Sequence, residues 1–566
     1  MKKWITREKP PEHLIDQVCL QFNISRLLAT ILHSRGMIAL EKIQKYLSPK
    51  LGNLSDPFLI PGMDQAAKRI LMAKENGERV LVYGDYDVDG VTATAILLKT
   101  FQLLGLDATY YIPHRYEEGY GLSNEAIEKI AEDNIDLIVT VDCGISSFEE
   151  ISYANDLGME VVVTDHHTIP EKMPPACAIV NPKVMEKGNP SRELAGAGVA
   201  FKFAWAILKL AGVKDSTFLA SLLDLAALGT IADVVPLTEE NRILASAGLK
   251  LINERKRAGI KALAESASIK GDIGITQINF GIAPRINAAG RLEHASKSLE
   301  LLLTDEFEAA KLMASELNRI NVRRQETGLE IKQEILLKIV EEGVGENKVI
   351  LLIGKAWHPG VIGIVASQIV DAYSRPVVLV GVDDGVGRGS ARSVDGVNVY
   401  DLLFSCKDLF NDFGGHAGAA GFEIKEENIV HLKKRLNQFA NDTISLDDLS
   451  PIIKIDMEID PSIINLNLIK ELQILAPFGE KNREPVFMAL GLTLTDVKLV
   501  GKDKHAKMNF SIGTNRLEAI GFGMGGQAGE LKIGNKYDIA FNLESNVWNG
   551  FEKVQLSLID IKEAAV

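Results

Sequence analysis

The sequence is poor in cysteine and lacks the patterns in which cysteine builds structure. Its four cysteines, Cys19, Cys143, Cys177 and Cys406, are scattered, and no two of them form a CxxC pair. This argues against a disulfide scaffold and against a zinc site made of thiolates. Isolated cysteines are typical of proteins in a reducing compartment, so we expect a cytoplasmic protein.

Long apolar runs are also missing. The best candidate, FKFAWAILKLAGV, is short and is interrupted by Lys202 and Lys209, whereas a membrane-spanning helix needs about 20 apolar residues. The first residues, MKKWITREKPPEHLIDQ, contain charges and two prolines but no apolar core of a secretory signal. We therefore expect neither membrane insertion nor export.

An excess of positive charge is absent as well. The 566 residues include 62 basic and 76 acidic side chains, which gives a net charge of −14. The surface as a whole should repel polyanions, so any nucleic-acid site has to be a local cleft. With 46% hydrophobic and 24% charged residues, the chain has the composition of a folded protein, and its length predicts roughly three to four domains.

Three apolar runs, each closed by acidic residues or histidines, dominate the first half of the chain. They are RVLVYGDYDVDG, DLIVTVDCGIS and MEVVVTDHH, and a helical pattern follows each of them. Strands alternating with helices in this way predict an α/β fold with a parallel, doubly wound sheet that is covered on both faces. The polar groups at the strand ends should then meet at one edge of the sheet.

The remaining patterns divide the chain into five expected regions. A charged helical pattern near SELNRINVRRQETGLEIKQEILLKIVEEG predicts a long connecting helix, and alternating runs near the C-terminus predict an antiparallel five-strand barrel of OB type. The expected regions are a helical lead-in (1–60), the sheet with the acidic strand ends (61–235), a helical region with the long helix (236–340), a smaller α/β domain (341–448) and the OB-type domain (449–566).

Asp85, Asp87 and Asp89 are spaced two apart directly after the first apolar run. In an extended segment these side chains would point in one direction, where only cations could offset their repulsion. An EF-hand loop is the rival interpretation, but its twelfth position would be Ile96 instead of glutamate, and a strand instead of a helix enters the loop. A solvated acidic turn would be an equally good reading of the triplet alone.

Further ligand-type residues follow the other strands. Asp142 ends one run, Asp165, His166 and His167 end another, and Asp233 lies in GTIADVVPL. Several carboxylates with one or two imidazoles suit Mn²⁺, with Mg²⁺ as the alternative. Two such ions sharing a carboxylate can activate a water and stabilise an in-line displacement at phosphorus, so phosphoester hydrolysis is the leading chemistry.

The motifs DYDVDG, VDCG, DHH and GTIADV, in this order, resemble the DHH phosphoesterase superfamily. Within it, the stretches YIPHRYEEGYGLS, APRINAAGRL, AWHPGVIGIVAS, GRGSARSVDG, FGGHAGAAGF and APFGEKNREPVF resemble the RecJ family over nearly the whole chain. The resemblance implies a DHH metal-binding domain, a long helix, a DHHA1 substrate-binding domain and an OB domain.

This resemblance also implies roles for the residues at the strand ends. The implied metal ligands are Asp85, Asp87, Asp89, Asp142, His166 and Asp233. Asp142 would bridge the two ions and act in catalysis. His167 would donate to a phosphate oxygen or orient the attacking water, and Asp165 would orient a histidine.

A second set of residues has the chemistry of phosphate binding. Arg388 and Arg392 with Ser390 offer guanidinium forks and a hydroxyl, and Gly414, Gly415 and His416 offer open backbone N–H groups and a ring donor. A basic strand end and a tight turn are the respective alternatives. By the resemblance, Arg115, Ser390 and Arg392 are candidates for the terminal phosphate, Tyr120 for base stacking, and Arg285 and Arg291 for lining the channel.

The OB-type module carries a basic strip with aromatic residues nearby. The strip comprises Lys498, Lys502, Lys504, Lys507 and Arg516, and the aromatic residues are Phe510, Phe522 and Trp548. Such a combination suits single-stranded nucleic acid, although lysine and phenylalanine also alternate on any half-buried sheet.

The resemblance implies a metal-dependent 5′→3′ exonuclease that degrades single-stranded DNA to nucleotide 5′-monophosphates in recombination and repair. The implied partners are the 5′ end of single-stranded DNA and a single-strand-binding protein. Two alternatives stay open: a DHH phosphodiesterase of short oligonucleotides or cyclic dinucleotides, and a non-catalytic scaffold of DNA replication.

Overall fold

The computed structural model describes residues 2–513, 515–548 and 550–564, without the side chain of Trp548, so the expectation for that ring lies outside the described residues. The chain forms two compact units. The smaller consists of Met1–Lys3, Glu265–Ser268 and Pro284–Ile452, and the larger of Trp4–Ala264, Ile269–Ala283 and Ile453–Val566. All four cysteines are free thiols. None of the helices in the described ranges is long and apolar enough to cross a membrane.

A five-stranded parallel sheet forms the core of the larger unit, as the sequence predicts. Its strand order is β3-β2-β4-β5-β6, and every neighbouring pair is parallel. Nearly all residues of the central strands are buried, which explains why these runs are apolar throughout. The strands are β2 (Val80–Gly84), β3 (Ala108–Tyr111), β4 (Leu137–Val141), β5 (Glu160–Thr164) and β6 (Ala178–Val180).

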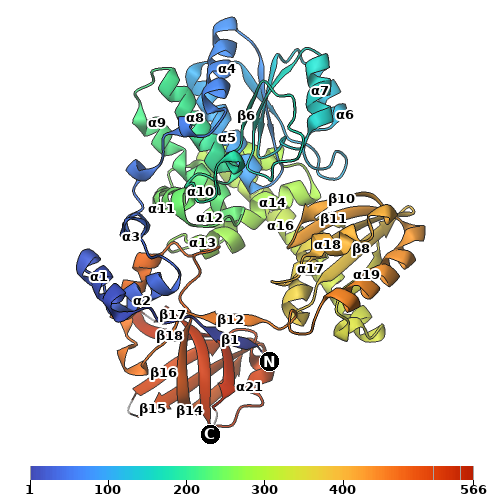
Figure 1. Cartoon of the computed structure of the whole chain (residues 1–566). Coiled ribbons are helices and arrows are strands. Elements are labelled where there is room, and N and C mark those ends of the chain that lie inside the picture. The colour runs from blue at the N-terminus through green and yellow to red at the C-terminus, as the bar shows by residue number, and fades with distance from the viewer. Residues whose placement is uncertain (1, 514, 549, 565–566) are drawn as a thin grey trace. The chain divides into compact units, whose positions relative to one another are not determined.

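Helices cover both faces of this sheet (Figure 1). One face carries α4 (Met63–Asn76), α5 (Val88–Leu104) and α8 (Gly196–Leu210), and the other carries α6 (Asn124–Glu132) and α7 (Phe148–Asp156). The chain continues through α9 (Ser216–Ser221), α10 (Leu223–Ala232), α11 (Glu239–Glu254), α12 (Ala258–Ser266), α13 (Ile275–Gln277) and the π-helix η4 (Ile278–Ile282). Helix α10 packs on both α5 and α8, close to the carboxyl edge of the sheet.

The C-terminal strands form a closed barrel. Strands β14 to β18 are ordered β14-β15-β16-β18-β17, and a further β14–β17 pairing closes the ring. The expectation of a purely antiparallel barrel is wrong in one place: β16 and β18 are parallel, because the chain crosses through α21 and β17 between them. The bounds are β14 (Phe487–Val500), β15 (His505–Ile512), β16 (Asn515–Gly521), α21 (Gly525–Ala528), β17 (Lys536–Trp548) and β18 (Phe551–Glu563), preceded by β1 (Lys3–Thr6), β12 (Ile452–Ile455), β13 (Met457–Glu458) and α20 (Leu466–Leu472).

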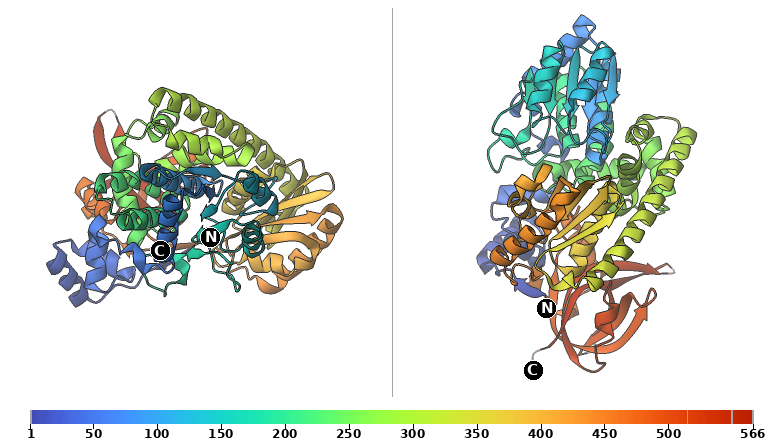
Figure 2. Two further views of the ribbon diagram at one scale, coloured as in Figure 1. Left: turned by 90° about the horizontal axis from the view of Figure 1, so that it is seen from above. Right: turned by 90° about the vertical axis from the view of Figure 1, so that its right-hand side faces the viewer.

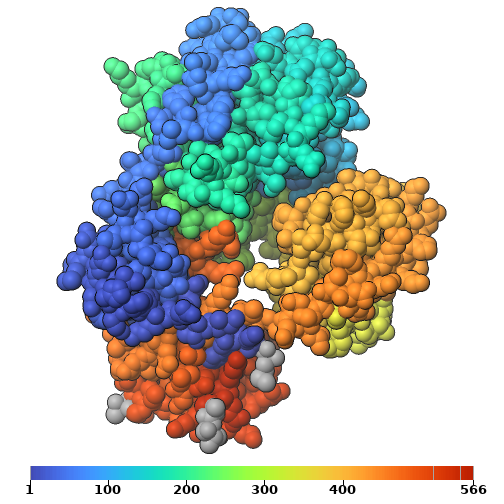
Figure 3. Space-filling view, in the orientation of Figure 1, coloured from blue at the N-terminus to red at the C-terminus, as the bar shows by residue number. Residues whose placement is uncertain are grey.

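The N-terminal helices share the hydrophobic core of this barrel. Buried residues of α1 (Glu12–Phe22), α2 (Arg26–Ser34) and α3 (Leu40–Leu47) belong to the same cluster as Phe487 and Phe541. In the space-filling view, the blue N-terminal residues lie directly against the orange barrel segment (Figure 3). The buried apolar residues of α1, α2 and α3 therefore pack together with those of the C-terminal module.

The buried guanidinium of Arg242 on α11 ties the same regions together. It donates hydrogen bonds to the carbonyl oxygens of Tyr46, Leu475 and Ala476 at 3.0, 3.0 and 2.7 Å. Its carbon also lies 3.9 Å from the centre of the Tyr46 ring. One side chain thus satisfies backbone groups from two segments far apart in the sequence.

The smaller unit contains a mixed sheet of order β10-β11-β9-β8-β7, in which β7 and β8 are parallel and the other pairs are antiparallel. The predicted long helix is α16 (Phe307–Glu341), which runs unbroken for 35 residues (Figure 2). The other elements are α14 (Ala283–Leu292), α15 (Ser296–Leu303), β7 (Ile350–Lys355), α17 (Pro359–Tyr373), β8 (Val377–Asp383), β9 (Val386–Arg392), α18 (Val399–Phe404), β10 (Phe410–His416), β11 (Ala419–Lys425) and α19 (Ile429–Thr443).

Candidate metal centre and substrate-binding residues

The acidic triplet lies where strand β2 turns into helix α5. The expectation of an extended segment is wrong here, because Asp87 is the N-cap of α5 and its Oδ1 accepts hydrogen bonds from the N–H groups of Asp89 and Gly90 at 2.9 and 3.2 Å. Asp89 consequently lies in the first helical turn. The turn separates the three carboxylates into two directions instead of one.

Two groups of side chains converge at the carboxyl edge of the sheet. Asp85, Asp87 and Asp142 have ligand atoms within 4.8 Å of one another, and Asp89, His166 and Asp233 form a second such group. His166 Nε2 lies 3.7 Å from Oδ2 of both Asp89 and Asp233. All six sequence-predicted ligands are therefore brought together.

Asp142 connects the two groups. Its Oδ1 lies 3.0 Å from His166 Nε2, and the residue also belongs to a third ligand group with His166 and His167. Asp142 follows strand β4 and has a positive φ of 62°, a conformation that costs about 1–3 kcal/mol in a non-glycine residue and persists where function requires it. The backbone conformation thus directs this carboxylate to the position where both groups meet.

Three buried polar atoms at this point have no hydrogen-bond partner among the described residues. They are Asp85 Oδ1, Asp142 Oδ1 and His166 Nε2, and the last two form no hydrogen bond although they lie 3.0 Å apart. A buried acceptor without a partner costs about 1–3 kcal/mol, and more if it is charged. Divalent cations would satisfy all three atoms, so the residues present fit a metal centre with carboxylate and imidazole ligands.

The electrostatics of the metal-free site agree with this reading. Burial and the charges of neighbouring aspartates raise the pKa of Asp85 and Asp142 well above the usual range, that of Asp89 to about 7 and that of Asp233 to about 9. Burial lowers the pKa of His166 to about 3. The imidazole is therefore neutral and can offer a lone pair, whereas the carboxylates lack compensating positive charge.

His167 has a different environment from His166. Its Nδ1 lies 2.8 Å from Asp165 Oδ1, which also accepts the N–H groups of both histidines. Burial opposes charging of the ring, but the bond to Asp165 and the nearby carboxylates raise the pKa of His167 to about 9. Burial likewise opposes ionisation of Asp165, yet the same bond lowers its pKa. The pair is thus a carboxylate with a protonated, half-exposed imidazolium.

Tyr120 and Arg115 lie beside these groups in the larger unit. The hydroxyl of Tyr120 lies 3.1 Å from His167 Nδ1 and donates to the carbonyl oxygen of Asp142 at 3.2 Å. Its side chain is 52% exposed. The guanidinium of Arg115 lies 4.7 Å from the centre of the Tyr86 ring, and its charge counteracts the raised pKa of Asp85. The two residues thus frame the acidic edge of the sheet.

The first turn of helix α8 also contributes to the site, which the sequence did not predict. The backbone N–H groups of Gly196 and Ala197 donate to the two carboxylate oxygens of Asp89 at 2.6 and 2.8 Å. The start of a helix carries partial positive charge and free N–H groups, which suit a carboxylate. The run LAGAGVAF, with small residues at the start of a helical pattern, was the available signal.

The phosphate-type residues of the smaller unit lie in adjacent strands. Arg388, Ser390 and Arg392 alternate along β9 and so share one face of the sheet. Arg392 Nη1 donates to Ser390 Oγ at 3.0 Å, whereas Arg388 lies 3.5 Å from the carboxylate of Glu423. The structure therefore brings Ser390 and Arg392 together and pairs Arg388 with an acidic neighbour.

Gly414, Gly415 and His416 end strand β10, in the same sheet, instead of forming the tight turn of the alternative interpretation. Across β11, His416 lies in the row of Arg392, and Gly414 lies in the row of Ser390. The two predicted sets thus share the same rows of the sheet, on either side of β11. On α14, Arg285 and Arg291 donate to the carbonyl oxygens of Ser266 and Gly360 at 3.3 and 3.1 Å.

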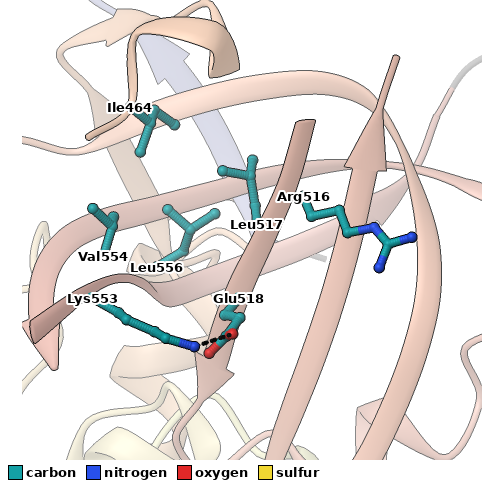
Figure 4. A pocket seen from close by; sticks show the side chains of 7 residues that line it. All are labelled: Ile464, Arg516, Leu517, Glu518, Lys553, Val554 and Leu556. Atoms are coloured by element: carbon teal, nitrogen blue, oxygen red, sulfur yellow. Dashed lines mark ion pairs between the residues drawn. The ribbon is translucent and has the colours of Figure 1, made fainter. Parts of the chain in front are cut away.

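The barrel has cations but few exposed aromatic rings. Lys498 and Lys507 are directly opposite each other on β14 and β15. Phe510 is fully buried in the core, so its expected role beside nucleic acid is wrong, whereas Phe522 is 62% exposed. Between β16 and β18, a pocket of about 230 Å³ is lined by four apolar and three charged side chains, with an ion pair of Lys553 and Glu518 at 3.6 Å (Figure 4).

Three family models match successive parts of the chain. They are the N-terminal domain of the DHH family at residues 79–230, the DHHA1 domain at 345–442 and the RecJ OB domain at 455–560. Each match lies within one of the regions expected from the sequence.

Curated relatives match over almost the whole chain. The single-stranded-DNA-specific exonuclease RecJ of Bacillus subtilis (strain 168) is 37% identical over 99% of this chain and 70% of its own length. The enzyme of the same name from Haemophilus influenzae is 37% identical over 92% of this chain and 93% of its own.

Solved structures agree with these matches. RecJ of Thermus thermophilus in complex with Mn²⁺ covers 100% of this chain and 80% of its own, with a TM-score of 0.86 and 32% identity. Its complex with Mg²⁺ gives a TM-score of 0.80 at 31% identity, covering 100% of this chain and 79% of its own. The chain therefore belongs to the RecJ family of single-stranded-DNA-specific exonucleases.

Proposed function

We propose that this protein is a metal-dependent exonuclease that hydrolyses single-stranded DNA from its 5′ end and releases nucleotide 5′-monophosphates. The observation that carries the proposal is the convergence of six ligand residues, three of which, Asp85, Asp142 and His166, have a buried ligand atom without a hydrogen-bond partner. A scaffold protein would gain nothing from retaining such mutually repelling carboxylates.

Two divalent ions would be held by the two ligand groups. Asp85 and Asp87 would hold one, Asp89, His166 and Asp233 the other, and Asp142 would be shared, as its membership in more than one group supports. We propose Mn²⁺ as the ion, with Mg²⁺ as the alternative, since related structures contain either. When bound, the ions supply the positive charge that activates water and stabilises in-line displacement at phosphorus.

His167 would act on the substrate directly. The imidazolium has a fixed orientation, because Asp165 accepts from its Nδ1 and the Tyr120 hydroxyl lies beside it. It can therefore donate a charge-assisted hydrogen bond to a phosphate oxygen. The half-exposed ring of Tyr120 can at the same time receive a base by stacking, worth about 1–3 kcal/mol.

Other residues would recognise the DNA backbone and its terminus. We propose Ser390 and Arg392 of the smaller unit and Arg115 of the larger unit as candidates for binding the terminal phosphate, and Gly414, Gly415 and His416 as candidates for binding a further phosphate. Arg388 would contribute once it exchanges Glu423 for phosphate. Arg285 and Arg291 would line the channel, and the lysines of the barrel would bind the strand further on.

We further propose the wider setting that the family suggests. The protein would act in the cytoplasm in DNA recombination and repair, with a single-strand-binding protein as its partner. Within the chain, 61–235 would be the catalytic DHH domain, 341–448 the substrate-binding DHHA1 domain and 449–566 the nucleic-acid-binding domain.

End-labelled substrates test the proposed activity. The protein is incubated with Mn²⁺ and single strands or duplexes that carry a label at the 5′ or the 3′ end, with an Asp142→Ala variant as the inactive control. We expect early release of the 5′ label, as a mononucleotide and from single strands only. Release of the 3′ label first, or cleavage restricted to short oligonucleotides or cyclic dinucleotides, would contradict the proposal.

A further inference from the structure

We infer that Gly196 and Gly229 are positioning residues that set the spacing of the two metal-ligand groups, an inference that rests on the proposed two-ion site. Neither glycine offers a ligand atom from a side chain. Each glycine contacts a ligand carboxylate so closely that a Cβ atom at its position would collide with that carboxylate.

Gly196 contacts both ligand groups at once. Its N–H donates to Asp89 Oδ2 at 2.6 Å. A Cβ atom added at Gly196 would lie 2.6 Å from Asp142 Oδ1 and 2.8 Å from both Cβ and Cγ of Asp142. The same residue therefore binds a ligand of one group and packs against the ligand that the two groups share.

A methyl group at position 196 could not be accommodated by a side-chain rotation. The Cβ atom of Asp142 is fixed by its backbone, which is held at a φ of 62°. Either Asp142 or the first turn of α8 has to move. Movement of Asp142 changes the shared ligand, and movement of α8 breaks the hydrogen bonds to Asp89, so both ions should be affected.

Gly229 also packs against the Asp89 carboxylate. A Cβ atom at this position would lie 2.6 Å from Asp89 Oδ1, 2.4 Å from Thr92 Oγ1 and 2.5 Å from the Cβ of Ala197. Helix α10 carries Gly229 and ends at its C-cap, Asp233, another ligand of the same group. A methyl group here presses on Asp89 directly and reaches Asp142 only through the first turn of α8, so it should weaken the ion held by Asp89, His166 and Asp233 more than the other ion.

Calorimetric titration of the metal-free full-length protein with Mn²⁺ tests these assignments. The variants are Gly196→Ala and Gly229→Ala. The matched control is Gly198→Ala on the same helix, where an added Cβ meets no metal-ligand residue: its nearest atoms are two flexible side-chain ends, Leu194 Cδ2 at 3.0 Å and Leu244 Cδ1 at 3.4 Å, and Leu194 Cβ at the ordinary contact distance of 3.5 Å. Melting temperatures of the metal-free proteins show whether each variant is folded.

We expect two bound ions in the wild type and in Gly198→Ala. Gly229→Ala should keep one tight ion and bind the other about 10- to 100-fold more weakly, the usual effect of losing a group that orients a ligand. Gly196→Ala should weaken both ions by a similar factor. Nuclease activity should recover at high Mn²⁺ concentration, which a merely misfolded variant would not do.

The outcomes separate this inference from the proposed function. No ion bound by the wild type would refute the two-ion site itself. Two ions bound by the wild type and with equal affinity by both folded glycine variants would overturn the positioning role alone. If Gly196→Ala does not fold, Gly229→Ala decides, because its expected loss falls mainly on one ion.

Discussion

The stability of the metal-free protein should fall as the pH rises from 7 to 9. Asp233 has a pKa of about 9 in the folded state, caused by burial and by the charges of Asp89 and Asp87, against about 3.9 in an unfolded chain. The folded state thus retains a proton that the unfolded state releases. Stability from a carboxyl group with a raised pKa is present at low pH and is lost as the pH approaches the folded value.

The size of the effect follows from the number of retained protons. One proton corresponds to about 1.4 kcal/mol per pH unit. His167, with a folded pKa of about 9, acts in the same direction, but its ring is 44% exposed, so solvent screening reduces its contribution. We expect Asp233 and His167 to contribute a slope of about 1–2 kcal/mol per pH unit, and the raised pKa values of Asp85 and Asp142 act in the same direction. The lowered pKa of His166 has the opposite sign, but it destabilises the folded state only below about pH 6.5.

Urea unfolding in the presence of EDTA at pH 7, 8 and 9 measures this slope. The matched control is Asp233→Asn, which has no proton to lose at this position and should show a flatter dependence. Adding Mn²⁺ should reverse the trend, because the ions bind only ionised carboxylates and stabilise more strongly as the pH rises. If the stability of the metal-free protein is constant or increases from pH 7 to 9, and Asp233→Asn has the same pH dependence, then Asp233 does not retain a proton in the folded state.

Three further changes have defined consequences. Asp142→Ala should abolish hydrolysis of a labelled single strand and raise the stability of the metal-free protein at pH 8, because a repelling carboxylate is removed; near-normal turnover would argue against the shared ligand. Arg392→Ala should reduce the preference for 5′-phosphorylated over 5′-hydroxyl strands by about 10-fold, the value of one charge-assisted hydrogen bond; an unchanged ratio would exclude it from the terminal-phosphate site. Arg242→Ala should lower the free energy of unfolding in urea by about 3 kcal/mol or more, since several buried carbonyl groups lose their donor; a loss below about 1 kcal/mol would show that other groups satisfy them.

The site could be predicted from the sequence as far as parallel strands determine it. Asp142 and His166 directly follow buried strands, and the carboxyl ends of parallel strands meet at one edge. Their convergence could therefore be predicted from the strand pattern alone. The mixed sheet of the smaller unit places Arg392 and His416 in one row. This register depends on how β9, β10 and β11 pair, which the sequence pattern of each strand does not specify.

Other features depend on contacts between distant segments. The acidic triplet is separated into two groups because Asp87 caps a helix. The two-residue spacing of the aspartates did not indicate that a helix begins within the triplet. The contact of Gly196 with Asp89 joins residues 107 positions apart. The shared core of the N-terminal helices and the barrel has the same origin. Deleting 451–566 would expose that core, so single substitutions such as Lys507→Glu are the better test of DNA binding by the barrel.

Anomalous scattering from crystals soaked in Mn²⁺ would locate the bound ions. We expect two peaks at the carboxyl edge of the parallel sheet, one beside Asp85 and the other beside His166, with an oxygen of Asp142 within coordination distance of each. A single peak that Asp142 does not contact, or no peak among these side chains, would contradict this expectation.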